Sequence, residues 1–549
     1  MSDDRPSEPF QSSEPFQPTG PTADFETVGP AGPTGDGRSR RGAVIGAVAV
    51  AVVAVLGGGA FAAYAYLNGD GPQPAEALPA STVAVVSVDL DPSAGQKIAA
   101  IKAIRKFPAL KESLGLQADD DLREYVFDKV IEDGECEGMT FDEDVKPWLG
   151  KRAAFALVDL GDEDPAPAIA LQVSNKAAAT KGFDAIVECT DPDDLAFVVG
   201  DEYLIASDTE EHAKAILDQG RTEPLADDAA YQKWTGETGD AGVLSFYVSS
   251  SAADYAVDFL DDMGSNLLGL GAGGLPSEGD DTTTEDPLDP AREALDGFQG
   301  MAGTVRFAGG GMELSLAGGG VTQFSDLATV GAQLGDLPAD TAVAFGFGVS
   351  EDYAGKLIDD MVSSEDTVAE IEQDTGLDLP DDLQTLLGRA ITISLGGDAP
   401  ESLDEVENLD EVPAGLVIHG DADEIQAVIA KVEDHLGIHL ADIPIVVDGS
   451  GDKVALATSS AYAEELLKSG GLASDDGFRS AVPDADRSTG ILYVDFDSPW
   501  RDVLVDLATD DDPRDGKELD ENSRPLRALG VSSWQDGDIS HVLVKVMTD

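Results

Sequence analysis

Apolar runs of strand length alternate with amphipathic patterns of helix length along most of the chain beyond residue 77. The run "ITISL" is typical, because Ile391, Ile393 and Leu395 alternate with Thr392 and Ser394 at a period of two. This period predicts an antiparallel strand with one face in the core and the other in water. We therefore expect the three aliphatic side chains to point inward and Thr392 and Ser394 to point outward.

The pattern occurs twice in the same order. "LPASTVAVVSVDL" from Leu78 returns as "LPADTAVAFGFGV" from Leu337, and "DVKPWLGKRAAFAL" from Asp144 returns as "DLQTLLGRAITISL" from Asp382. Each copy predicts a strand, helices, two strands, a helix, two strands, a helix, a late strand and a closing hairpin. We predict an α+β fold with two related modules from an internal duplication, each a mainly antiparallel sheet covered by helices.

Turn residues mark the closing hairpins and two long interruptions. The hairpins are "TVRFAGGGMELSL" and "SSWQDGDISHVLVKV", and the second turns at Asp536 and Gly537. Residues 265–297 and 506–525 are rich in Asp, Gly and Thr or Asn, and they interrupt the two copies at matching places. We predict that both segments are loops.

One long apolar stretch near the N-terminus stands apart from this pattern. Residues 43–67 contain no charge and no proline, and a helix of this length crosses a bilayer. Arg38, Arg40 and Arg41 precede it, so the positive-inside rule places the N-terminus in the cytoplasm of a single-pass protein of the cell membrane. A cleaved signal peptide is the alternative. The predicted parts are a disordered cytoplasmic tail (1–41), a transmembrane helix (42–67), a tether (68–77), and extracytoplasmic copies one (78–320) and two (321–549).

Charge is the unusual feature of the composition. The chain has 107 Asp and Glu residues against 34 Lys and Arg residues, which gives a net charge of -73. Such a field repels nucleic acid, so we exclude nucleic-acid binding, and it attracts cations and basic partners. The acidity has two interpretations, adaptation to salty surroundings or the binding of divalent cations. No other cofactor is predicted.

The chain contains two cysteines, Cys136 and Cys189, and both fall in the predicted extracytoplasmic part. Thiols pair readily in an oxidising compartment. We therefore predict one disulfide between them. It would pin an insertion that only copy one has.

The stretch "TFDEDVKPWLGKRAAFAL", residues 140–157, concentrates carboxylates around Trp148. The second copy keeps an acidic residue, since Asp144 matches Asp382, but it replaces Trp148 by Leu386. An acidic residue near a helix N-terminus is stabilising, and an apolar position common to both copies indicates packing. We predict a structural role with Trp148 in the core. The alternative is an exposed Trp148 that binds a sugar or a base.

Two motifs resemble a known family. "LPASTVAVVSVDLDP" and "DVKPWLGKRAAFAL", behind a single apolar span and a Pro-rich tail, are similar to the uncharacterised membrane-anchored proteins of actinobacteria grouped as domain of unknown function 3352. The resemblance covers residues 75–549. It implies an actinobacterial cell surface but no particular activity, so it assigns no functional residue.

Motifs for catalysis and metal binding are scarce. The sequence has no GxSxG, HExxH or Walker pattern, so we name no catalytic or cofactor-binding residue. His435 and His439 lie four residues apart and would share one face of a helix, but Gly437 between them weakens that helix. We therefore assign no metal ligands.

A basic cluster contrasts with the acidic remainder of the chain. "QKIAAIKAIRKFPALK" has the spacing of an amphipathic helix, and its basic residues form a candidate contact face: Lys97, Lys102, Arg105, Lys106 and Lys111. This face would contact lipid phosphates, wall anions or the chain's own acidic loops. A solvated face on a core helix is the alternative.

Together these patterns predict a single-pass envelope protein that binds or scaffolds an unknown envelope protein or wall component without catalysis. The groove between the two modules is the expected site. Two alternatives remain. One is an envelope hydrolase that acts on wall polymers through carboxylates, and the other is a sensor that signals through its N-terminal tail.

Overall fold

The computed structural model describes residues 73–90, 106–108, 123, 124, 127, 138–189, 195–240, 242–255, 297–308, 310–320, 327–361, 365–400, 406, 408–437 and 444–549. The predicted tail and span and residues 265–296 lie outside these ranges. Among the residues that are described, no helix combines the length and the apolar character needed to cross a bilayer.

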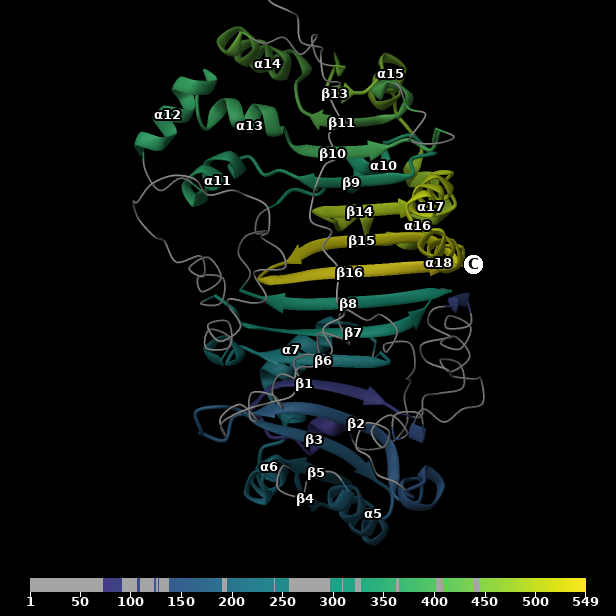
Figure 1. Ribbon diagram of the computed structural model, residues 1–549. Coiled ribbons are helices and arrows are strands. Elements are labelled where there is room, and N and C mark those ends of the chain that lie inside the picture. The colour runs from purple at the N-terminus through teal and green to yellow at the C-terminus, as the bar shows by residue number, and fades with distance from the viewer. Residues whose placement is uncertain are drawn as a thin grey trace, which may run out of the picture. The chain divides into compact units, whose positions relative to one another are not determined.

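The described strands form one antiparallel sheet of sixteen strands, in the order β12-β13-β11-β10-β9-β14-β15-β16-β8-β7-β6-β1-β2-β3-β5-β4 (Figure 1). The first half contributes β1 (Thr82–Asp89), β2 (Leu149–Val158), β3 (Ala166–Val173), β4 (Ala196–Val199), β5 (Tyr203–Ser207), β6 (Leu244–Ser249), β7 (Gly300–Ala308) and β8 (Gly311–Gly319). The second half contributes β9 (Val343–Gly348), β10 (Ala390–Leu395), β11 (Ala414–His419), β12 (Val446–Ser450), β13 (Lys453–Ala457), β14 (Gly490–Asp495), β15 (Leu526–Asp536) and β16 (Ile539–Thr548).

Helices and short turns fill the connections between the strands. The first half has η2 (Pro74–Glu76), η3 (Phe141–Val145), α5 (Lys176–Cys189), α6 (Glu210–Thr222), η4 (Leu225–Asp227) and α7 (Ala229–Glu237). The second half has α10 (Gly331–Gly335), α11 (Tyr353–Met361), α12 (Glu365–Thr375), α13 (Asp381–Leu387), η8 (Leu409–Glu411), α14 (Ala422–Leu436), α15 (Ser460–Leu467), η10 (Leu472–Ser474), α16 (Asp476–Ala481), η11 (Ala485–Arg487), α17 (Trp500–Asp511) and α18 (Pro513–Ser523). The predicted α+β class is confirmed.

The strand order is the same in the two halves. From the outer edge to the middle of the sheet, the first half runs β4-β5-β3-β2-β1-β6-β7-β8 and the second runs β12-β13-β11-β10-β9-β14-β15-β16. Each strand of the first half therefore has a counterpart at the same place in the second half.

The halves meet strand to strand. β8 pairs with β16 in an antiparallel ladder that extends from Gly311 opposite Met547 to Gly318 opposite Ser540. Pairing satisfies the backbone groups that each half would otherwise leave at a sheet edge. The two modules therefore share one continuous sheet instead of forming a sheet each, because the last strands of the two halves pair with each other. A binding site in a groove between the modules stays a prediction.

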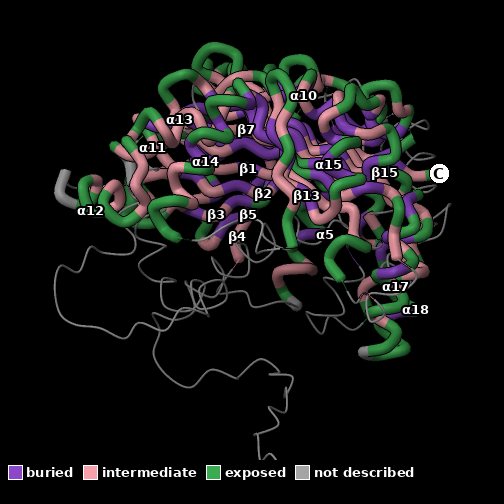
Figure 2. The backbone as a smooth tube through the Cα atoms, turned by 90° about the horizontal axis from the view of Figure 1, so that it is seen from above, coloured by how far each residue is buried: buried purple, intermediate pink, exposed green. Residues whose placement is uncertain are grey.

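Helices α6, α7, α10, α15 and α16 pack on one side of the sheet, which we call the covered face. In the first half, Ile216 of α6 and Trp234 of α7 belong to one buried cluster with Ala156 and Tyr247 of the sheet. Leu334, Leu466 and Phe478 do the same in the second half. Figure 2 shows buried residues along the strands and exposed residues on helices at the margin, such as α12 and α18.

Residues 506–525 do not form the predicted loop, because most of them belong to α17 and α18. Asp512 caps α18 by accepting the N–H of Arg514 at 2.8 Å, and Pro513 occupies the first turn. Lys517 and Glu521 pair one turn apart at 3.5 Å. The Asp-rich composition that suggested a loop instead supplies a cap and ion pairs of an exposed helical hairpin.

The closing hairpins are confirmed as β7–β8 and β15–β16. The second hairpin turns with Gly537 at a φ of +60°, a conformation that glycine adopts without strain. Residues 448–453 likewise form a hairpin turn, in which Ser450 of β12 faces Lys453 of β13.

Candidate functional site

The strand "ITISL" is oriented opposite to the prediction. Ile393 is 44% exposed, whereas Thr392 is 0% and Ser394 is 4% exposed. The two polar residues point into the covered face, where the Thr392 hydroxyl lies 3.0 Å from Nε2 of His419 and the Ser394 hydroxyl lies 2.9 Å from the hydroxyl of Tyr462. Hydrogen bonds to buried partners make burial of these hydroxyls acceptable. The aliphatic side of β10 therefore lies on the other face of the sheet.

This other face, which we call the apolar face, is apolar across the whole sheet. The strand registers bring one residue from each of the sixteen strands into a continuous row that holds no polar side chain. In strand order the row is Val447, Leu456, Leu416, Ile393, Phe345, Leu492, Val531, Val544, Leu314, Val305, Leu244, Val88, Ala153, Leu171, Leu204 and Val199.

A second row lies beside the first and holds no charge. From β10 to β3 it consists of Ile391, Phe347, Gly490, Ser533, Val542, Leu316, Gly303, Phe246, Val86, Phe155 and Ile169. The outward face of a half-buried antiparallel sheet normally carries polar side chains. The apolar face departs from that rule over the full width of the sheet.

Helices α5 and α14 cover the two ends of the apolar face. Phe183 of α5 belongs to a buried cluster with Leu204, and Ile425 of α14 belongs to one with Ile418. The helices start at corresponding caps, since Asn175 accepts the N–H of Ala178 at 3.1 Å and Asp421 accepts the N–H of Glu424 at 3.1 Å. The two ends of the face are therefore closed by matching helices.

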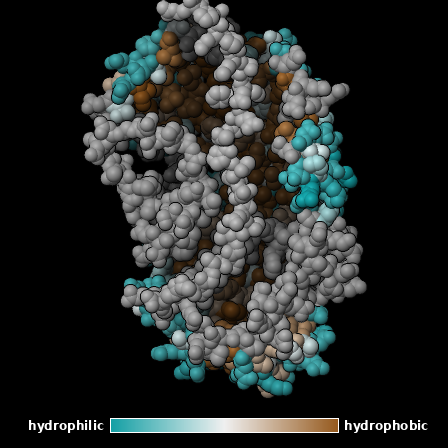
Figure 3. Space-filling model, in the orientation of Figure 1, coloured by the Kyte–Doolittle hydropathy of each residue, from teal (hydrophilic) through white to brown (hydrophobic). Residues whose placement is uncertain are grey.

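Between these ends the apolar face is partly exposed from β10 to β8. Every residue of the two rows on these six strands is at least partly accessible, and Phe345 reaches 42%. On β6 and β7, by contrast, Leu244 and Val305 are buried. Figure 3, which views this face, shows hydrophobic residues along its middle and hydrophilic residues at its margins. Contiguous exposed apolar surfaces often mark binding sites.

The stretch at residues 140–157 has the predicted structural role. Trp148 is 1% exposed, its Nε1 donates to the backbone oxygen of Asp144 at 2.7 Å, and its ring meets that of Phe183 edge-on. The carboxylate of Asp144 accepts the N–H of Thr140 at 2.9 Å. The core position predicted for Trp148 is confirmed.

The matching carboxylate in the second half makes the same contact. Asp382 accepts the N–H of Asp378 at 2.7 Å, and it also pairs with Lys431 of α14 at 2.5 Å. The backbone N–H of Asp378 and then Lys431 hold the pKa of Asp382 below its usual value. These carboxylates therefore fix the chain next to η3 and α13.

The predicted basic contact face is described at one residue. Lys106 donates from Nζ to the hydroxyl of Thr548 at 2.8 Å, which places it at the end of β16. The other members, Lys97, Lys102, Arg105 and Lys111, lie outside the described residues. Whether they form one contact face stays a prediction.

The predicted disulfide also stays a prediction. Cys189 is the last residue of α5, and Cys136 lies outside the described residues. For the histidines, Nε2 of His435 lies 2.8 Å from the backbone oxygen of Gln373, and His439 lies outside the described residues. Among the residues that the structure describes, no group of three or more metal-ligating side chains gathers.

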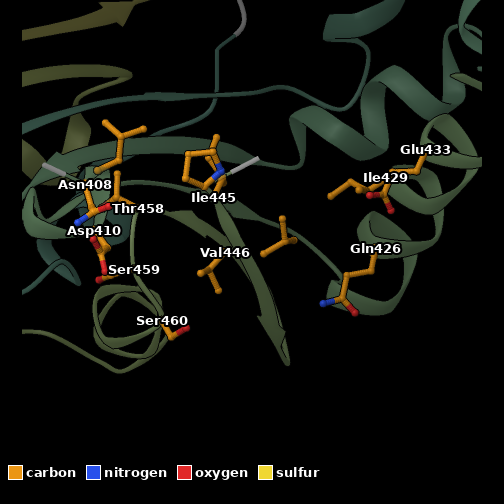
Figure 4. A pocket seen from close by; sticks show the side chains of 13 residues that line it. Asn408, Asp410, Gln426, Ile429, Glu433, Ile445, Val446, Thr458, Ser459 and Ser460 are labelled. Carbon is orange, nitrogen blue, oxygen red and sulfur yellow. The ribbon is translucent and has the colours of Figure 1, made fainter. Parts of the chain in front are cut away.

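A cavity of about 1190 Å³ lies beside the edge strand β12, and no sequence motif indicated it. In Figure 4, residues of α14 line one side and residues 408–410 and 458–460 line the other. Asp410 and Glu433 bring carboxylates to the cavity, and Leu409 brings an apolar side chain that is 52% exposed. The cavity is a second candidate site, but its mixed lining defines no particular ligand.

His419 is a buried ionisable group on the covered face, next to Thr392. Burial, followed by the nearby cations of Lys453 and Arg389, lowers the pKa of His419 from 6.5 to about 4. The residue is therefore neutral at neutral pH and acts as a structural hydrogen-bonding group.

We expect His419 to weaken the fold as the pH falls. In the unfolded chain the imidazole of His419 has a pKa near 6.5, whereas in the folded protein its pKa is about 4. The carboxylates of Asp452 and Asp336 raise this pKa, but burial and the nearby cations lower it more. The contribution of His419 to the free energy of unfolding is therefore complete above pH 6.5 and is lost as the pH falls to about 4. The total loss is about 3 kcal/mol at most. Urea unfolding at pH 7 and pH 4.5 should show a smaller pH effect for His419→Gln than for the parent protein. Equal pH effects would contradict this expectation.

Comparison with known proteins gives one match. Residues 45–188 match the family described as a protein of unknown function, DUF3352, which confirms the resemblance over these residues. Beyond residue 188 the resemblance stays a prediction. No curated protein and no solved structure matches the chain.

Proposed function

We propose that this chain, whose residues 45–188 match DUF3352, is a non-catalytic binding protein of the cell envelope and that the apolar face is its binding surface. The observation that carries the proposal is the orientation of β10, which buries Thr392 and Ser394 and leaves Ile393 44% exposed. Each 100 Å² of apolar surface in contact with water costs about 2.5 kcal/mol relative to its burial. An apolar ligand would remove this cost.

The proposal includes a single-pass anchor. The charge-free stretch at residues 43–67 and the three preceding arginines support a cytoplasmic N-terminus and an extracytoplasmic domain. Labelling of single cysteines placed at Ser12 and at Ser540 with a membrane-impermeant reagent on intact cells would test this. Labelling at residue 12, or none at residue 540, would contradict the orientation.

We also propose that the two halves arose by internal duplication. The repeated motifs, the identical strand orders and the matching contacts of Asp144 and Asp382 support it. An experimental structure in which the halves could not be superposed strand by strand would argue against it.

Photo-crosslinking of the full chain in living cells tests the binding surface. A photoreactive benzoylphenylalanine in place of Phe345 is expected to capture a molecule other than this chain. The control carries the same group in place of Leu519, which is similarly exposed but lies on α18. We expect at least a fivefold higher yield of adducts at residue 345. Equal yields, or links from residue 345 only to this chain itself, would overturn the proposal.

A further inference from the structure

We propose that the ligand of the apolar face is the hydrocarbon of membrane lipids, and that zwitterionic lipids are preferred to anionic ones. This inference rests on the proposed function, because it assigns a chemical class to the ligand of that surface. The site is the partly exposed stretch from β10 to β8.

The size of this stretch fits lipid chains. Six strands span five spacings, or about 24 Å, across the sheet. One leaflet of a bilayer core is about 15 Å thick, so an acyl chain has about this length. The rows that contain Phe345 and Ile391 run side by side over this distance, so more than one acyl chain can lie along them.

The side chains of the apolar face from β10 to β8 favour hydrocarbon over peptide as the ligand. Across the two rows from β10 to β8 the only polar side chain is that of Ser533, and no charge is present. Each of these strands is paired on both sides, so a peptide cannot add to the sheet as a further strand. An extended peptide lying flat on the face would leave backbone N–H and C=O groups without partners, at a cost of kilocalories each. An acyl chain has no such groups.

The position of the domain supplies a source of lipid. The predicted span ends at Leu67, and the described structure begins at Gln73. The six Cα–Cα steps from Leu67 to Gln73 reach at most about 20 Å. The start of the sheet domain is therefore held close to a bilayer surface, where lipid is the most concentrated apolar molecule.

The charge of the chain sets the headgroup preference. The net charge of the chain is -73, and residues beyond the predicted span carry nearly all of it. A domain of this charge repels anionic headgroups at distances up to the Debye length, about 8 Å at physiological salt. Zwitterionic headgroups do not meet this repulsion.

Reconstituted protein tests the inference. The full chain, with the photoreactive group in place of Phe345, is placed in vesicles of equal parts phosphatidylcholine and phosphatidylglycerol, irradiated and analysed by mass spectrometry. We expect lipid adducts at residue 345, at least fivefold above those at the Leu519 control. At low salt the phosphatidylcholine adducts should exceed the phosphatidylglycerol adducts several-fold, and the ratio should approach one as salt is added.

A second variant links the adducts to the apolar rows. Ile393→Asp places a charge opposite Phe345, and its own exposure makes the substitution tolerable to the fold. We expect it to lower the lipid adducts at least fivefold, because the carboxylate would have to lose water beside the ligand. Unchanged adducts would overturn the inference.

The two proposals fail in different ways. Capture of a protein, peptide or glycan at residue 345 in cells, with no lipid adduct in vesicles, overturns the lipid inference and leaves the binding surface standing. Links only within this chain overturn both. A salt-independent ratio of one between the two lipids overturns the headgroup preference.

Discussion

Trp148→Ala is expected to lower the free energy of unfolding of the first half by about 3–5 kcal/mol. Trp148 is almost fully buried and joins η3, β2 and α5 through its hydrogen bond to Asp144 and its edge-on contact with Phe183. A Cβ on Gly182 would lie 2.2 Å from Nε1 of Trp148, so the ring is closely packed against α5. Its removal leaves a cavity and an unfilled acceptor.

Hydrogen exchange followed by mass spectrometry measures this effect locally. In Trp148→Ala the amides of β2, β3 and α5 should exchange faster, by the factor that corresponds to the lost stability. The matched control is Leu386→Ala, since Leu386 aligns with Trp148 in the sequence repeat and is only partly buried. We expect the control to lose about 1–2 kcal/mol. An equal loss of unfolding free energy in both variants would show that Trp148 contributes no more to core packing than Leu386 does.

Glu313→Gln is expected to destabilise the join of the halves by about 3 kcal/mol. Glu313 of β8 lies between two cations on the neighbouring strands. It accepts from Nε of Arg306 at 2.7 Å and lies 3.8 Å from Nζ of Lys545. All three side chains are mostly buried, so loss of the carboxylate charge leaves two cations facing each other in a poorly hydrated place.

Urea unfolding, followed by circular dichroism, checks the second prediction. The control is Glu521→Gln on α18, whose exposed pair with Lys517 should contribute less than about 1 kcal/mol. Lys545→Met in the Glu313→Gln background should restore part of the loss, because it removes one of the two unpaired cations. Equal effects of Glu313→Gln and Glu521→Gln would mean that the buried charges are well hydrated.

Local periodicity was sufficient to predict the order of the strands along the chain. The closing hairpins and the core position of Trp148 followed from turn residues and from apolar spacing, which are local properties. The position of the acidic residue was predicted less well, since Asp144 lies within η3 and not before it, and its carboxylate accepts the N–H of Thr140. These features depend on neighbours a few residues apart.

Features that depend on distant partners could not be predicted. The period of β10 showed two kinds of face but not which one the helices cover, and Thr392 and Ser394 proved to be buried because His419 and Tyr462 supply their partners. The helix α18 was read as a loop because the same Asp residues serve turns and caps equally well. The row of apolar residues arises only from the registers of sixteen strands.

Because β8 pairs with β16 within one chain, the apolar face forms completely at any protein concentration. The two strands hold the same place in their halves and pair antiparallel, which is the geometry of an isologous contact between identical subunits. A contact of this kind between separate chains would form only in proportion to the amount of protein present. Because both strands belong to one chain, the stretch from β10 to β8 is complete in every molecule, even in a cell that makes only a few copies.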